Sequence, residues 1–442
     1  MDQTLCEQTP TDAGTSEKQR SPPTSPLESL PNDALLAILS AACSTVDLYA
    51  FIRASPVIYR AFSSAKRAVL VSIVARDLGP ALRDGVAATL ITPAKVKYRG
   101  AADYEETDRA IQRYKALPHG DGGLASAKGL PADMVVALVR ANRSVQFFID
   151  EFAESRLPEL RKINPDAAGP LTANERRRLA QALLRHQFLA RIECGNSLPR
   201  HAAVVHKFFS LLRPWETQQL ADCHSFLCHM LSCAFPYSKK RADPARSSWV
   251  KPQSQVEKDA ALCDLDALHL TLVAERARVA ADPPVLAGGE APRRMQPGWM
   301  TISARFNFLI AGPLPVQVGS DRVAEECWGV RDELYRREDA MPPLVPADDH
   351  DSAAPPFAWV DAHGGLDCQR WGRHARREVL PEGQESTTGR QRIWMRQKLE
   401  RWRWLGFMFW DRARVELLKT GLPGYTTGWL TVAPPPDAEC EF

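Results

Sequence analysis

The sequence predicts a mostly α-helical protein, with a three-helix N-terminal module followed by an irregular helical body and few or no strands. Helix start signals recur along the chain, and apolar residues follow most of them at spacings of three and four. The chain also has 34 prolines and no repeat of the WD, kelch or leucine-rich period. These features exclude a long coiled coil and the common solenoids.

The first predicted helix begins near Pro31, because proline suits the first helical turn, where its missing N–H has no helical partner to lose. Leu35, Ile38, Leu39 and Ala42 then recur at i, i+3, i+4 and i+7. This spacing places four apolar side chains on one face of the helix.

Two further helix starts follow closely. Ser44 and Asp47 form a Ser-x-x-Asp start signal, and Ser55-Pro56 is a capping residue followed by a proline at the first helical position. The apolar residues after these starts are Leu48, Phe51 and Ile52 in the second helix, and Tyr59 and Phe62 on one side of the third. The sequence therefore predicts three helices in a compact module.

This pattern resembles the F-box, the N-terminal module of the substrate adaptors of cullin-type ubiquitin ligases. The matching positions are Leu30-Pro31, Asp33, Leu35, Ile38-Leu39, Asp47-Leu48, Arg53-Ala54-Ser55, Tyr59 and Phe62. The chain departs from the family in two places: the usual tryptophan of the third helix is absent, and the link Ala41-Ala42-Cys43 is smaller than the usual leucine-bearing one.

The resemblance implies that the first two helices dock in a groove of a Skp-type subunit and, through it, join a cullin. The residues that it places in this contact are Leu30, Pro31, Leu35, Ile38, Leu39, Leu48 and Ile52. The alternative is that these helices form the edge of a larger core of the same chain. Burial of a Leu or Ile side chain is worth about 1.5–3 kcal/mol in either setting, so energetics do not separate the two.

The whole-chain composition describes an ordinary soluble protein of the cytoplasm or nucleus. The 442 residues carry a net charge of +3, so no global field draws the chain to nucleic acid or to an acidic membrane. Ten cysteines in a chain of this length are too few for a disulfide scaffold and are expected to be reduced. No secretory leader and no run of about eighteen apolar residues is present, so no membrane span is expected.

The expected organisation follows composition changes along the chain. We expect a disordered leader over 1–26, the F-box-like module over 27–65, a helical body over 66–235, a helix between flexible linkers over 236–298, an aromatic-rich helical region over 299–432 and a disordered tail over 433–442. The leader contains three candidate sites for proline-directed phosphorylation, at Thr9-Pro10, Ser21-Pro22 and Ser25-Pro26. Phosphate at Ser25 would lie just before the first helix, where negative charge interacts favourably with the helix dipole.

The body is expected to be mostly helical. Its expected helices cover Lys66–Asp77, the stretch from Gly79-Pro80 to about Leu90, Pro131–Asn142, a long helix after the capping box Thr172–Glu175, Pro214 to about Cys233, and Val256–Ala280. Met300–Ile310 fits a strand and a helix, with a helix favoured, and short extended pieces are expected at Phe357–Val360 and Trp429–Val432. Asp121-Gly122-Gly123 and His363-Gly364-Gly365 are interpreted as turns.

Catalytic and metal sites find little support. Cysteines and histidines cluster over 223–233, but on a helix Cys223 and Cys228 point about 140° apart, and only His224 and Cys228 share a face. Structural zinc prefers four ligands, so buried small apolar side chains are the favoured interpretation, and no metal or cofactor is predicted. No phosphate-binding loop, G-x-S-x-G or H-E-x-x-H motif occurs, and the protein is not expected to be an enzyme.

Basic and aromatic residues alternate over Arg390–Leu418, and nine of the eleven tryptophans lie at or after Trp299. Three interpretations stay open: a core helix whose arginines extend to solvent, a surface that recognises a protein substrate, and a nucleic-acid-binding surface, which is the least favoured. The weak candidates for substrate recognition are Arg392, Arg396, Trp402 and Trp404.

The expected function is that of a non-catalytic substrate-recognition adaptor of a cullin-type (SCF) ubiquitin ligase, with an unknown protein substrate. The helical body resembles that of filamentous-fungal F-box proteins of uncharacterised chemistry, at Asp47–Pro56 and Leu212–Glu216. The alternatives are a stand-alone interaction protein with a degenerate F-box and a nucleic-acid-binding protein that uses the C-terminal basic-aromatic segment.

Overall fold

The computed structural model describes residues 25–42, 44–91, 101–118, 122–193, 207–234, 264–281, 356–358 and 404–421. Within these residues every regular element is an α-helix or a short 3-10 helix, which confirms the predicted mostly-α fold. None of the described helices combines the length and the apolar composition needed to cross a bilayer. The chain divides into two compact units, unit 1 over Met1–Val69 and unit 2 over Leu70–Phe442, and each is described by itself.

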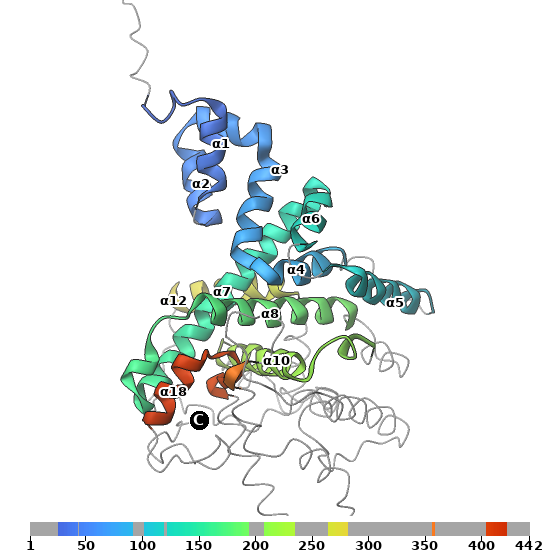
Figure 1. Ribbon diagram of the computed structural model, residues 1–442, viewed down its shortest axis with the longest axis vertical. Coiled ribbons are helices and arrows are strands. Elements are labelled where there is room, and N and C mark those ends of the chain that lie inside the picture. Colours follow the sequence, from blue (N-terminus) through green and yellow to red (C-terminus); the bar gives the residue numbers. More distant parts are fainter. Residues whose placement is uncertain are drawn as a thin grey trace, which may run out of the picture. The chain divides into compact units, whose positions relative to one another are not determined.

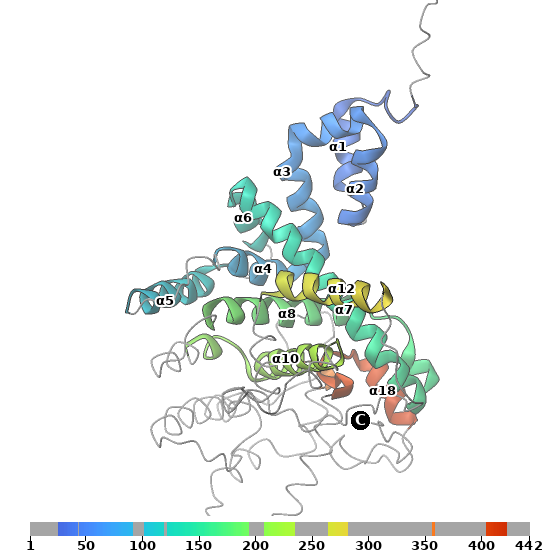
Figure 2. The ribbon, with the colours of Figure 1, turned by 180° about the vertical axis from the view of Figure 1, so that it is seen from behind.

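Unit 1 contains α1 (Asn32–Ser40), α2 (Thr45–Ala54) and the first part of α3 (Pro56–Leu78). The start signal of α2 is confirmed, because Ser44 Oγ accepts a hydrogen bond from the Asp47 N–H at 3.1 Å. The start of α3 is also confirmed, with Pro56 as its first residue and Ser55 before it. Pro31 lies one position earlier than predicted: it has an extended ψ of 148° and precedes α1. Both views show α1 and α2 side by side (Figures 1 and 2).

The buried side chains of unit 1 come from all three helices. The apolar ones are Leu35, Leu39 and Ala42 from α1 and its end, Leu48 from α2, and Ile58, Ala61, Phe62 and Val69 from α3. Of the two residues predicted to lie on one side of α3, Phe62 is 6% exposed and Tyr59 is 56% exposed, so only Phe62 belongs to the interior. The inward stripe of α3 instead follows i, i+3 and i+4 from Ile58.

Unit 2 is built around α8, which packs on α4, α7 and α10. Its remaining elements are arranged around these helices (Figures 1 and 2). In chain order the elements of unit 2 after α3 are η1 (Gly79–Ala81), α4 (Leu82–Thr89), α5 (Ala101–Ala116), α6 (Gly122–Gly129), α7 (Ala132–Ile163), η3 (Pro165–Ala168), α8 (Ala173–Glu193), α10 (Pro214–Ala234), α12 (Leu265–Ala281), η5 (Phe407–Phe409) and α18 (Arg412–Thr420).

Several predicted elements of unit 2 are confirmed. The predicted helix Lys66–Asp77 lies inside α3, and the predicted break falls at Gly79, whose φ of 49° favours glycine. The capping box at the start of α8 forms in both directions: the Glu175 N–H donates to Thr172 Oγ1 at 3.2 Å, and the Thr172 N–H donates to Glu175 Oε2 at 3.0 Å. Proline opens α10 at residue 214, as predicted.

Two predictions about helix ends are wrong. Gly122 and Gly123, which were predicted to lie in a turn, are the first two residues of α6. The helix predicted to end at Asn142 continues to Ile163 and passes through Pro158. Its continuation is stabilised by burial of one face of the second half of α7, which includes Phe148, Ile149, Phe152 and Leu160.

An aromatic cluster joins α5, α8 and the short helical segment 207–209 before α10. The Tyr114 ring lies 4.9 Å from the Phe188 ring and 5.6 Å from the Phe208 ring, and all three side chains are buried. Helix α5 was not predicted from the sequence.

The other predictions for the body lie mostly outside the described residues. Phe357 and Ala358 are helical, so the extended piece predicted there is wrong for these two residues. The predictions that lie outside the described residues concern 256–263, Met300–Ile310, His363–Gly365 and Trp429–Val432.

Candidate functional site

Unit 1 exposes several large apolar side chains. Among the described residues, seven large apolar side chains are exposed, and four of them lie in unit 1. These four are Leu30 at 37%, Val46 at 70%, Tyr49 at 57% and Tyr59 at 56% exposure. Scattered apolar residues are normal on a protein surface, but concentration in one small unit indicates an interaction site.

The seven residues that the resemblance places in partner contact divide by burial. Leu35, Leu39 and Leu48 are 1–3% exposed, so they form the interior of unit 1 and are not available to a partner in this conformation. Partner contact at these three leucines stays a prediction, and in the free chain they face the interior of the unit. The residues of this set that stay accessible are Leu30 and Pro31, which are exposed, and Ile38 and Ile52, which are half-buried.

Helix α2 carries a second apolar stripe that the sequence reasoning missed. Val46, Tyr49, Ala50 and Arg53 are all exposed and recur at i, i+3, i+4 and i+7, which places them on one face. The Arg53 guanidinium lies 5.4 Å from the centre of the Tyr49 ring. The signal was present in the sequence, since both faces of α2 carry apolar residues at helical spacing, but spacing alone does not show which face is covered.

The candidate docking surface therefore consists of the accessible residues just described: Leu30, Pro31, Ile38, Ile52, Val46 and Tyr49. It presents apolar and aromatic side chains, and the exposed charged residues on the same two helices include Asp33, Asp47 and Arg53. Its chemistry is that of binding, by burial of apolar area against another surface.

The C-terminal basic-aromatic segment is described over 404–421, and there it belongs to the core. Phe407, Phe409 and Trp410 are 0–1% exposed. The half-buried Trp404 ring is covered by the Arg156 guanidinium, 4.0 Å from the ring centre. Trp404 therefore does not present an open face to a substrate or a base. Of the other weak candidates, Arg392, Arg396 and Trp402 lie outside the described residues.

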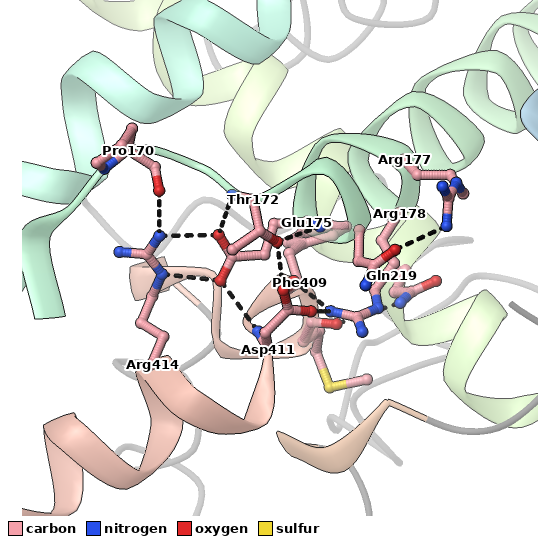
Figure 3. Close-up of polar contacts among 11 residues, drawn as sticks. Pro170, Thr172, Glu175, Arg177, Arg178, Gln219, Phe409, Asp411 and Arg414 are labelled. Atoms are coloured by element: carbon pink, nitrogen blue, oxygen red, sulfur yellow. Dashed lines mark hydrogen bonds and ion pairs between the residues drawn. The ribbon is translucent and has the colours of Figure 1, made fainter. Parts of the chain in front are cut away.

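A buried polar network fixes this segment to α8 (Figure 3). The Arg414 guanidinium donates to both oxygens of the Glu175 carboxylate at 2.8 Å, and Glu175 is 0% exposed. The Asp411 N–H donates to Glu175 Oε1 at 3.0 Å, and the Asp411 carboxylate pairs with Arg178 at 2.8 Å. The charged groups of this network pair with one another within the fold, so its role is structural.

Two histidines meet between α8 and α10. His186 Nε2 and His224 Nδ1 lie 3.0 Å apart, and both side chains are 0% exposed. Burial lowers the pKa of His186 well below its ordinary value, and a charge on His224 would lower it further. One proton shared between two neutral rings satisfies this contact. Among the described residues, no group of three or more potential metal ligands converges.

A serine, a histidine and an aspartate meet between α7 and α12, but not in a catalytic order. The Ser144 hydroxyl donates to Asp266 Oδ1 at 2.6 Å and contacts His269 Nδ1 at 3.1 Å. Because the hydroxyl donates its one hydrogen bond to the carboxylate, the imidazole can meet Oγ only as a donor and does not activate it. Burial raises the pKa of Asp266 and lowers that of His269. Ser144 itself is buried, and the group joins the two helices.

No family model, no curated protein and no solved structure matches this chain.

Proposed function

We propose that unit 1 is an F-box-like docking module and that the protein is a non-catalytic substrate-recognition adaptor, which binds a Skp-type subunit and, through it, a cullin. The observation that carries the proposal is the concentration of exposed apolar side chains on unit 1, at residues that match or adjoin the F-box pattern. The target of the adaptor is a protein, recognised by unit 2.

The local chemistry of unit 1 supports this proposal. Helices α1, α2 and α3 begin at Asn32, Thr45 and Pro56, within a residue or two of the starts predicted from the sequence. Leu35, Leu39 and Leu48, which belong to the resembling pattern, are buried inside the unit. Leu30 and Pro31 precede α1 and are exposed, as a residue pair that meets a partner must be. An apolar, helix-borne surface of this kind is suited to a hydrophobic groove.

The second exposed stripe supports a contact that involves α2. Val46 and Tyr49 together would remove two large side chains from water on binding, and each fully buried side chain contributes about 1.5–3 kcal/mol. Tyrosine and arginine are frequent anchors of protein interfaces, and Arg53 lies over Tyr49.

The test is co-purification of the full chain with a Skp-type subunit. The variant Leu30→Asp/Val46→Asp places two charges on the docking surface at exposed positions, so the fold of unit 1 is expected to stay intact. We expect at least a tenfold loss of affinity, because an unpaired charge in an apolar interface is costly. Leu39→Asp is unsuitable for this purpose, since Leu39 is 1% exposed and its replacement would unfold the unit.

A matched control is available on α12. Leu270 is 69% exposed, close to the 70% of Val46, and lies in unit 2. Leu270→Asp should therefore leave Skp binding unchanged. Equal binding by the double variant and the wild type would refute the docking surface, and so would absence of any complex between the wild-type chain and the Skp-type subunit.

Cullin co-purification separates the adaptor from the stand-alone alternative. An adaptor captures the Skp-type subunit and the cullin together, and loses both with Leu30→Asp/Val46→Asp. A chain whose F-box is degenerate captures neither of them.

A further inference from the structure

A turn before α1 contains an exposed serine in front of a proline. Ser25 is exposed, Pro26 follows it, and the Ser25 C=O accepts a hydrogen bond from the Glu28 N–H at 2.9 Å. Ser25 Oγ accepts from the Leu27 N–H, and the Glu28 carboxylate accepts from the Ser25 N–H, both at 3.3 Å. Serine and glutamate thus satisfy each other's backbone groups, as in a capping box.

The same glutamate also reaches the start of α3. Its second carboxylate oxygen accepts a hydrogen bond from Ser55 Oγ. Ser55 is 5% exposed and in turn accepts from the Val57 N–H at 3.1 Å and the Ile58 N–H at 3.4 Å. One carboxylate, that of Glu28, therefore connects the turn at residues 25–30 with the first residues of α3.

We propose that Ser25 is the site of phosphorylation by a proline-directed kinase, and that the phosphate separates Glu28 from Ser25 and loosens the turn at residues 25–30. In this reaction Ser25 Oγ forms a bond to the γ-phosphorus of a nucleoside triphosphate. The bond from that phosphorus to the bridging oxygen breaks, a nucleoside diphosphate leaves, and the hydroxyl proton passes to a base of the kinase.

Charge explains the direction of the effect. A phosphoserine carries a charge of about −1.5 to −2 near neutral pH. At residue 25 it would lie close to the Glu28 carboxylate, which accepts a hydrogen bond from the Ser25 N–H and is negative as well. The phosphate oxygens also compete for the Ser25 and Leu27 N–H groups that now serve this box. Repulsion between the two anions displaces the glutamate.

The helix dipole does not reverse this result. The first α-helix begins at Asn32, and the residues directly after Ser25 form only a turn. A single turn has few aligned peptide groups, so the favourable interaction expected from the sequence alone is weak at this position. The proposal concerns the stability of the turn and does not depend on the proposed function.

The first experiment asks whether Ser25 is modified. The full-length chain is incubated with a recombinant mitogen-activated protein kinase and ATP, and phosphorylated residues are located by mass spectrometry. We expect phosphate on Ser25, and loss of that signal in the variants Ser25→Ala and Pro26→Ala. Phosphate confined to Thr9 or Ser21 would overturn the proposal.

The second experiment asks what the phosphate does. Hydrogen exchange is compared between the phosphorylated and unphosphorylated full-length chain. The amides of residues 27–30 are expected to exchange at least fivefold faster after phosphorylation. In Glu28→Gln, which removes the negative charge, phosphorylation should change these rates by less than twofold. Unchanged or slower exchange in the phosphorylated wild type would overturn the proposal, as would an equal acceleration in Glu28→Gln.

Discussion

Replacing Arg414 by methionine should strongly destabilise unit 2. The Arg414 side chain is 7% exposed and donates five hydrogen bonds: two to the Glu175 carboxylate and three to the carbonyls of Ala167, Gly169 and Pro170. Methionine keeps much of the apolar stem but leaves the carboxylate without its counter-ion, at a position that is 0% exposed. Breaking a buried pair in this way costs about 3–5 kcal/mol.

Thermal unfolding of the full-length chain, followed by calorimetry and circular dichroism, measures this loss. A domain of 150–250 residues loses roughly 2–4 °C per kcal/mol, so a loss of about 3–5 kcal/mol should lower the melting temperature by about 6–20 °C. The control is Arg176→Met: the neighbouring Arg176 on α8 pairs with Asp150 at 3.0 Å, with the two side chains 43% and 58% exposed. Loss of this exposed ion pair should lower the free energy of unfolding by no more than about 1 kcal/mol.

The double variant Arg414→Met/Glu175→Gln tests the electrostatic part of the reasoning. It removes both charges and leaves no buried ion unpaired. Its loss of unfolding free energy should therefore be clearly smaller than the sum of the losses in the two single variants. If Arg414→Met costs no more than Arg176→Met, the network does not hold the C-terminal segment, and the structural role assigned to it is wrong.

Three further predictions concern acid stability, the core of unit 1 and a strained glycine. The pKa of His229 is lowered to about 4, first by burial and then by the charge of Arg156. The folded state therefore binds fewer protons than the unfolded state between pH 6.5 and 4, so urea titrations should show a free energy of unfolding about 2 kcal/mol lower at pH 5 than at pH 7.5, with a smaller difference in His229→Gln. Leu39→Ala should lower the stability of unit 1 by about 2–5 kcal/mol, because the side chain is 1% exposed. Val46→Ala, at a position that is 70% exposed, should change it by no more than about 0.5 kcal/mol. Hydrogen exchange of residues 32–62 measures both effects. Gly406→Ala should lower the melting temperature, since φ is 83° and the new Cβ would clash with a buried aromatic ring, at a cost of at least ~1–3 kcal/mol.

Local signals predicted the helix starts because the groups that define them are close in sequence. The Ser44–Asp47 cap and the Thr172–Glu175 box each span three residues, and both form as expected. Glu175 shows the limit of this reasoning. Its second role is to hold Arg414, a residue 239 positions away, and nothing in the local sequence identifies that partner.

The local sequence also does not show which side of a helix is covered by the rest of the fold. The spacing of apolar residues on α2 fits two faces, and only the packing of unit 1 shows that Leu48 turns inward while Val46 and Tyr49 stay in water. The length of α7 also depends on packing. No capping signal ends the helix at Asn142, and the buried aromatic residues of its second half stabilise the continuation. Tertiary contacts decided both points.

The two segments that the sequence marked as interaction candidates differ in how their apolar residues are used. At the C-terminus, Phe407, Phe409 and Trp410 are buried in the core. In the described part of that segment these rings are therefore not available to a substrate or a nucleic acid. In unit 1 the inward stripes are filled, yet Val46 and Tyr49 remain more than half exposed. Leaving large apolar side chains in water has no benefit for the isolated fold, whereas covering them by a partner stabilises the complex. For this reason the proposed contact with another protein is assigned to unit 1 and not to the C-terminal segment.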